Sequence, residues 1–214
     1  MRDGEQGEEQ DSEPGASSQQ GFVRSALIFY GILGCVGLFW RMSVPGESIL
    51  HPPGAGEPMM GILSAGALGV SLGLLAVGLS ELMTRFSSLG EALADVLSEG
   101  LAGIGRADAI LLAFASGIAE EMFFRGALQP AVGLFWASLA FGACHFLPRR
   151  ELALWAVFAV AMGFAFGWLF LWTGQLVAPV AAHVVINGIN LPRLAQRGAE
   201  RVSRPADESD PPAR

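Results

Sequence analysis

The chain has no lysine, because all 13 of its basic residues are arginine, and only 15% of its 214 residues are charged. A soluble domain carries about 25% charged residues. The two cysteines, Cys35 and Cys144, both lie in apolar runs and are too few for a disulfide framework. Residues 22–192 hold ten acids against seven arginines, which leaves no basic surface of the nucleic-acid-binding kind. A disulfide scaffold, a nucleic-acid binder and a soluble globule are therefore excluded as first interpretations.

Hydrophobic residues, by contrast, make up 52% of the chain. They gather in six segments, at 22–40, 59–79, 107–128, 131–147, 151–172 and 175–191. A membrane-spanning helix needs about 20 such residues. Glycines recur within the segments, and small residues let helices approach closely in a bilayer. We therefore expect an all-α, polytopic transmembrane helical bundle of about six spans.

Both ends of the chain are polar. Residues 1–21 contain six acids and one arginine, and residues 193–214 are rich in Arg, Asp and Pro. Such segments bury too little apolar surface to offset the entropy lost on ordering. We expect two disordered tails, 1–21 and 193–214, around a transmembrane domain at 22–192 whose motif core is 107–191.

The arginines predict the orientation of the bundle. With the N-terminus inside, nine arginines flank the spans on the cytoplasmic side and only Arg41 lies outside. The nine are Arg24, Arg85, Arg106, Arg149, Arg150, Arg193, Arg197, Arg201 and Arg204. The pattern favours a multi-pass protein of a bacterial inner membrane with both termini in the cytoplasm.

The loop at 81–105 has a helical period of its own. Apolar residues recur at spacings of three and four from Phe86 to Ile104, with Glu91, Asp95 and Glu99 on the other face. This pattern predicts an amphipathic helix at the membrane interface. A structural collar is the favoured interpretation, with a substrate gate as the alternative.

Six polar residues lie inside the predicted spans: Glu120, Glu121, Arg125, His145, His183 and Asn187. Ionisable groups at this depth cost about 2.5–3.5 kcal/mol each, so they suggest function. Glu121 and Arg125 are four residues apart, in the order that favours an ion pair on a helix. From a helical rise of about 1.5 Å per residue, the acid at 120, both histidines and Asn187 fall within a layer about 8 Å thick. The four side chains are therefore expected to line one cavity.

Three motifs carry a family resemblance. Residues 120–125 read EEMFFR, 141–145 read FGACH and 183–187 read HVVIN, which match EExxxR, FxxxH and HxxxN. Together, in this order on successive apolar segments, they resemble the CPBP family of glutamate intramembrane proteases. That family includes the CAAX prenyl endopeptidases and bacterial relatives linked to bacteriocin processing or of the myxosortase kind.

The resemblance implies a role for each motif. It makes Glu120 the base that activates a water, helped by His145, and assigns the oxyanion site to His183 and Asn187. Glu121 would form a structural pair with Arg125, and Phe141 would support the site. The alternatives are a second acidic partner for Arg125 at position 120, a core histidine at 145, and an interhelical hydrogen-bond pair at 183 and 187. Cys144 as a thiol nucleophile is a weaker alternative, because adjacent helical residues point apart.

No cofactor is expected. Glu120, His145 and His183 could in principle bind zinc. The sequence lacks an HExxH pair, however, and Arg125 lies close to Glu120. His51 is interpreted as a loop residue.

The resulting prediction is an intramembrane endopeptidase that cleaves a membrane-anchored protein or peptide near its membrane-embedded, C-terminal end. Besides this substrate, the lipid bilayer is expected as a partner, and no nucleic acid is expected to bind. The alternatives are a catalytically idle membrane scaffold or immunity-type binding protein, and a small proton-coupled transporter.

Overall fold

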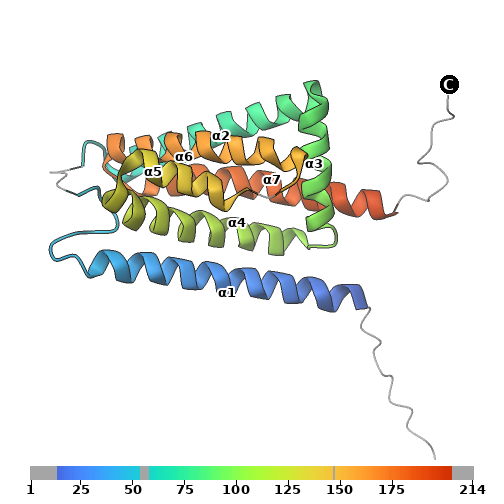
Figure 1. Ribbon diagram of the computed structural model, residues 1–214, viewed down its shortest axis with the longest axis horizontal. Helices are drawn as coiled ribbons and strands as arrows, with labels where there is room; N and C mark the ends of the chain where they lie inside the picture. The colour runs from blue at the N-terminus through green and yellow to red at the C-terminus, as the bar shows by residue number, and fades with distance from the viewer. Residues whose placement is uncertain (1–13, 54–57, 147, 204–214) are drawn as a thin grey trace, which may run out of the picture.

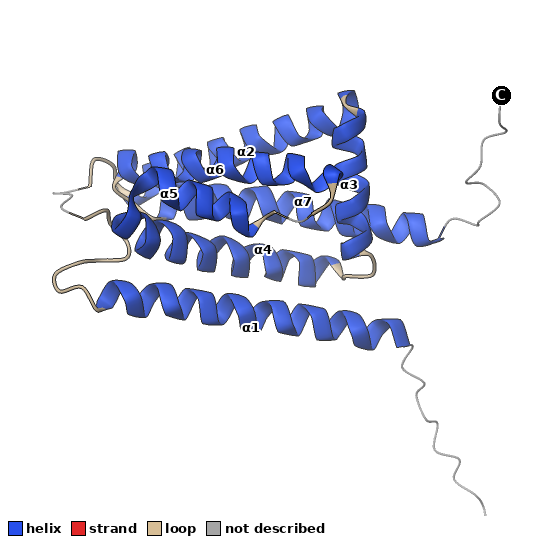
Figure 2. Ribbon diagram, viewed as in Figure 1, coloured by secondary structure: helices blue, strands red, loops and turns tan. Residues whose placement is uncertain are grey.

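The computed structural model describes residues 14–53, 58–146 and 148–203, and this part of the chain contains helices but no strand (Figures 1 and 2). The elements are α1 (Pro14–Met42), α2 (Ile62–Phe86), α3 (Ser88–Leu101), α4 (Arg106–Glu121), the π-helix η1 (Met122–Leu128), α5 (Gln129–Cys144), α6 (Arg150–Thr173) and α7 (Val177–Ser203). The long helices run side by side, and α3 crosses one end of the bundle (Figure 1). We call this end the α3 end. The prediction of an all-α polytopic bundle is confirmed.

Four described stretches are long and apolar enough to cross a membrane, which makes this a multi-pass membrane protein. They are Ser18–Met42, Ile62–Phe86, Arg106–Cys144 and Leu152–Thr173. The third contains two of the six predicted segments, which separate at Gly133, a residue with φ of 83°. The second of these, α5, has 16 residues and is short for a span of about 20. The sixth predicted segment lies in α7, whose many polar residues keep it outside this set.

Helix α1 begins at Pro14, inside the segment expected to be disordered up to residue 21. The side-chain amide of Gln19 donates a hydrogen bond of 2.7 Å to the carbonyl of Ala102, which follows α3. This contact with a distant segment gives the first turns of α1 a partner that composition could not predict. The rest of the predicted N-terminal tail, residues 1–13, lies outside the described residues.

At the other end, α7 continues 11 residues past the predicted boundary at residue 192, to Ser203. Arg197 and Arg201, expected in a disordered tail, both form ion pairs with Asp95 on α3. Gly198 lies so close to α3 that an added Cβ would be 2.2 Å from the carbonyl oxygen of Ser98. The tail is therefore helical because α3 provides a surface for it. Residues 204–214 lie outside the described residues.

The amphipathic helix predicted within 81–105 is α3. Ser87 caps its N-terminus by accepting a hydrogen bond of 3.3 Å from the backbone N–H of Gly90. The helix packs on α2, α6 and α7, so its acidic face meets arginines of α7 and its apolar face turns into the bundle.

Glycines set the approach of α2 to α7. An added Cβ at Gly69 would be 2.0 Å from the carbonyl oxygen of Ala178, and one at Gly73 would be 2.8 Å from that of Ala182. The small residues of the second apolar segment thus permit close helix packing, as their spacing suggested. This packing places the first residues of α7, including His183, beside the core of the bundle.

Candidate active site

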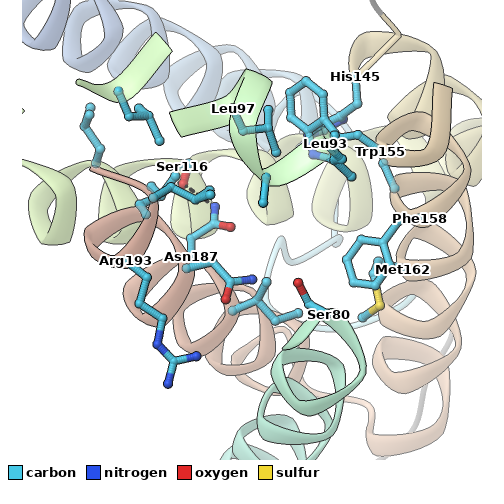
Figure 3. Close-up of a pocket in the computed structure, with 18 of the residues that line it drawn as sticks. Ser80, Leu93, Leu97, Ser116, His145, Trp155, Phe158, Met162, Asn187 and Arg193 are labelled. Atoms are coloured by element: carbon cyan, nitrogen blue, oxygen red, sulfur yellow. Dashed lines mark hydrogen bonds between the residues drawn. The ribbon is translucent and has the colours of Figure 1, made fainter. Parts of the chain in front are cut away.

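A cavity of about 670 Å³ extends from the middle of the bundle to the α3 end. Glu120, His145, His183 and Asn187, the four residues predicted to be catalytic, all line it. Glu120 lies on one face of α4 with Ser116 and Leu112, at intervals of four residues. In Figure 3, Ser116 and Asn187 lie together on one side of the cavity, and the rings of Phe158 and Trp155 lie on the opposite side. The structure therefore brings together residues that lie up to 67 positions apart in the sequence.

Glu120 is 8% exposed, and its Oε2 atom is buried without a hydrogen-bond partner. The nearest basic group is His145, whose Nε2 lies 3.8 Å from Oε2. This separation is too long for a direct hydrogen bond. A buried polar atom without a partner is unusual and points to a bound water or ligand.

His145 follows the last residue of α5, with φ of −98° and ψ of 1°. Its Nδ1 lies 2.7 Å from the carbonyl oxygen of Phe141. A carbonyl only accepts hydrogen bonds, so Nδ1 must carry a proton, and Nε2 of the neutral ring is left with a lone pair toward Glu120. Trp155 contacts the ring edge to face at 5.1 Å and helps to fix it. The orientation suits a histidine that accepts a proton from the cavity.

Glu121 and Arg125 form the predicted ion pair, with Arg125 Nη1 donating to Glu121 Oε1 at 2.8 Å. Both residues are almost completely buried. The second guanidinium nitrogen donates to the carbonyl of Gly163 at 3.3 Å. The guanidinium carbon also lies 4.4 Å from the ring centre of Phe141 and 5.2 Å from that of Phe166, within the range of cation–π attraction. Phe141 therefore supports the buried pair as well as the His145 ring.

Residues 122–128 form a π-helix rather than a continuation of α4. The backbone N–H of Gln129 donates to Phe124, five residues back, and Pro130 follows at the start of α5. Proline has no N–H to donate, which weakens the α-helical pattern at this point. Such π-helical turns are frequent at functional sites. This one follows directly after the two glutamates, and no sequence pattern predicted it.

His183 has a partner that the sequence did not predict. Its Nδ1 lies 2.8 Å from Glu121 Oε1, the oxygen that also accepts from Arg125. A carboxylate paired with arginine accepts, so His183 Nδ1 carries the proton. The ring then has a proton on Nε2 only when it is an imidazolium. Glu121 thus orients a residue of the site in addition to balancing Arg125.

Asn187 is held by Ser116, which the sequence analysis missed. The Asn187 amide nitrogen donates to Ser116 Oγ at 2.9 Å, and Ser116 in turn donates to the carbonyl of Ala113 at 3.2 Å. Because the serine proton is used, Ser116 can only accept, which fixes the amide orientation. The second N–H and the oxygen of Asn187 stay available. The spacing of four between Ser116 and Glu120 was the one signal in the sequence.

The remaining candidates lie away from the cavity. Cys144 is exposed on the outside of α5 and does not line it. His51 lies in the loop after α1, where its Nδ1 contacts the carbonyl of Gly174 at 2.8 Å. Within the described ranges, no three His, Cys, Asp or Glu side chains converge into a metal-binding group.

Comparison with known proteins places the motifs in a family. Residues 104–189 match the model of the "Type II CAAX prenyl endopeptidase Rce1-like" family. The chain is also 44% identical over 82 residues, 37% of its length, to the uncharacterized protein YpbD of Bacillus subtilis, and it covers 40% of that relative. No solved structure matches. The part of the chain that carries all three motifs, residues 104–189, is therefore Rce1-like, and the resemblance to the CPBP protease family is confirmed over this segment.

Proposed function

We propose that the protein is an intramembrane endopeptidase in which Glu120 and His145 activate a water for attack on a peptide bond. The observation that carries the proposal is the facing pair of acceptors in the cavity, the partnerless Oε2 of Glu120 and the Nε2 of His145, 3.8 Å apart. Two acceptors at this distance repel unless a donor lies between them. A water is the simplest such donor.

The distance suits one water molecule. A water about 2.8 Å from each atom would meet them at an angle of about 85°, which allows it to donate one hydrogen to each. Its lone pairs would then point into the cavity, toward a substrate carbonyl. Glu120 takes the proton as the water attacks, because a general base must lie within hydrogen-bonding distance of the proton that it removes, and Oε2 would do so.

Asn187 is the proposed donor to the oxyanion. Asn187 lines the cavity, and Ser116 holds one hydrogen of its amide, so the second hydrogen can be donated without reorientation of the amide during the reaction. His183 can donate from Nε2 to the oxyanion only when its ring carries both protons, because Nδ1 is already bonded to Glu121. The tetrahedral intermediate collapses when the scissile C–N bond breaks and Glu120 returns its proton to the leaving amine. The products are a carboxylate and an amine, and the enzyme is restored.

The cavity indicates the type of substrate. Its wall toward the α3 end is apolar, with Leu93, Leu97 and Leu101 from α3, while charged side chains of α2 and α7 line its mouth. It therefore fits an apolar segment that enters from the α3 end and presents a peptide bond to Glu120. We propose that this end lies on the cytoplasmic side of a bacterial inner membrane, in accordance with the arginine pattern. The proposed substrate is a membrane-anchored protein or peptide.

The experiment compares protein termini in membranes from cells that produce the wild type, Glu120→Gln or Glu99→Gln. Glu120→Gln keeps the shape of the side chain but removes the base, whereas Glu99 lies exposed on α3 and serves as the control. New C-termini should appear with the wild type and Glu99→Gln and be absent with Glu120→Gln at equal membrane abundance. Identical termini with all three proteins would exclude a protease that depends on Glu120 and favour a scaffold or a transporter.

A further inference from the structure

Helix α1 lies outside residues 104–189, but it packs closely on the helix that carries the glutamates. The two helices lie side by side and run in the same direction (Figure 1). An added Cβ at Gly37 would be 2.9 Å from the Cα of Phe123, and one at Gly34 would be 3.6 Å from the Cβ of Ala119. The glycine face of α1 therefore sets the distance and register between α1 and the start of η1.

Tyr30 lies on this same face, four residues before Gly34 and seven before Gly37. It is thus one turn nearer the α3 end than the contact of Gly34 with Ala119. Long side chains on a helix lean toward its N-terminus, which turns the Glu120 carboxylate toward the same level. Tyr30 and Glu120 both line the cavity, so the two side chains face the same space from two helices that are in contact.

We propose that Tyr30 is a positioning residue of the active site, whose hydroxyl donates a hydrogen bond to Glu120 and holds the carboxylate toward His145. The inference rests on the proposed function and extends the site to a helix that the family match does not include. One carboxylate oxygen would otherwise be free to rotate away, since Oε2 has no partner of its own. A phenol is suited to this task because it is neutral, rigid and a good donor.

The first test is Tyr30→Phe, which keeps the ring and removes only the hydroxyl. Its kcat should fall about 10- to 100-fold, the range expected for one hydrogen bond to a charged group, while KM stays within about twofold. The pH dependence of kcat should change as well, because the lost donor contacts the titrating base. Ile32→Val is the control, since Ile32 lies nearby on α1 and is 60% exposed. Unchanged kcat and pH profile in Tyr30→Phe would overturn the proposal.

The second test uses the glycines. Gly37→Ala brings a methyl group against the backbone of Phe123 and must displace α1, whereas Gly34→Ala makes only an ordinary contact. Gly37→Ala should lower kcat, and adding Tyr30→Phe to it should lower kcat little further. Gly34→Ala should leave both the activity and the full effect of Tyr30→Phe intact. If Tyr30→Phe lowers kcat by the same factor in the Gly37→Ala protein as in the wild type, α1 does not act through Tyr30.

A third measurement is independent of activity. Tyr30 is the only tyrosine in the chain, so the Raman doublet of tyrosine in the purified protein reports one hydroxyl. The wild type should show a strong donor, and Glu120→Ala should lose this signature. An identical doublet in both proteins would overturn the Tyr30 inference whether or not the protein is a protease. Cleavage that depends on Glu120 but not on the Tyr30 hydroxyl would leave the proposed function intact.

Discussion

Replacing Glu121 by glutamine is the sharpest test of the buried pair. Glu121 is completely buried and Arg125 is 1% exposed, so the substitution leaves the guanidinium without its paired carboxylate in apolar surroundings. Breaking a buried ion pair in this way costs about 3–5 kcal/mol. The whole free energy of unfolding of a typical domain is only about 5–15 kcal/mol. We therefore expect much lower abundance in the membrane and a lower midpoint of thermal unfolding in detergent.

The matched control is Glu81→Gln. Glu81 also pairs with an arginine four residues on, at 2.7 Å, but in an exposed position. Exposed pairs of this kind contribute about 0.3–0.5 kcal/mol, so this variant should unfold within a few degrees of the wild type. A second variant, Glu121→Gln with Arg125→Met, removes both charges and should recover abundance, because an apolar replacement of a buried pair is often neutral.

The double variant should stay inactive even though its abundance recovers, because His183 has lost the charged partner that fixes its tautomer. Thermal unfolding and cleavage are measured on the same purified samples. Equal stability of Glu121→Gln and Glu81→Gln would refute the structural role of the buried pair. Full activity of the double variant would refute the role of Glu121 in orienting His183.

Further predictions concern the site, the metal, the topology and pH. Asn187→Ala should reduce kcat about 10²- to 10³-fold with little change in KM, because an oxyanion donor acts in the transition state; loss of binding with intact turnover would make it a recognition residue. Cleavage should survive exhaustive chelation, whereas loss of activity that only zinc restores would make Glu120 a ligand. A reporter fused after Arg204 should be cytoplasmic and a label near Pro53 external, and the reverse would overturn the orientation. Partial burial acts to raise the pKa of Asp95, but hydrogen bonds from Arg201 and Arg197 outweigh it and hold this pKa below 3.8. Because this pKa is lowered, Asp95 stabilises the fold above about pH 4, and its contribution disappears as the pH falls through the folded-state pKa. The wild type and Asp95→Asn should therefore differ in unfolding temperature near pH 7 and have the same unfolding temperature in strong acid. A difference that stays constant with pH would contradict the ion-pair role.

The helical class and the set of polar residues that line the cavity could be predicted because they depend on local pattern. Long apolar segments can satisfy their backbone in a bilayer only as helices, whatever their partners are. Glu120, His145, His183 and Asn187 were conspicuous in the sequence because ionisable and polar groups are costly inside a predicted span. The spacing of four between Glu121 and Arg125 was enough to predict their pairing, since a helix makes such residues neighbours.

Where helices end was less predictable, because it depends on contacts between distant segments. The amide of Gln19 meets Ala102, and Asp95 meets Arg197 and Arg201, so both predicted tails are helical well beyond the expected boundaries. Composition reports whether a segment is polar, but not whether an oppositely charged helix lies beside it.

Within the site, the sequence determined which side chains lie in the polar layer, and the tertiary structure decided how they are paired. Nothing in the spacing joins His183 to Glu121, or Asn187 to Ser116, because these partners lie on helices that only packing brings together. The same holds for the proposed contact of Tyr30 with Glu120, which depends on the close approach of α1 to Phe123 that Gly37 allows. Periodicity along one helix fixes the face on which a residue lies, whereas the partner of that face depends on the close packing of side chains between helices.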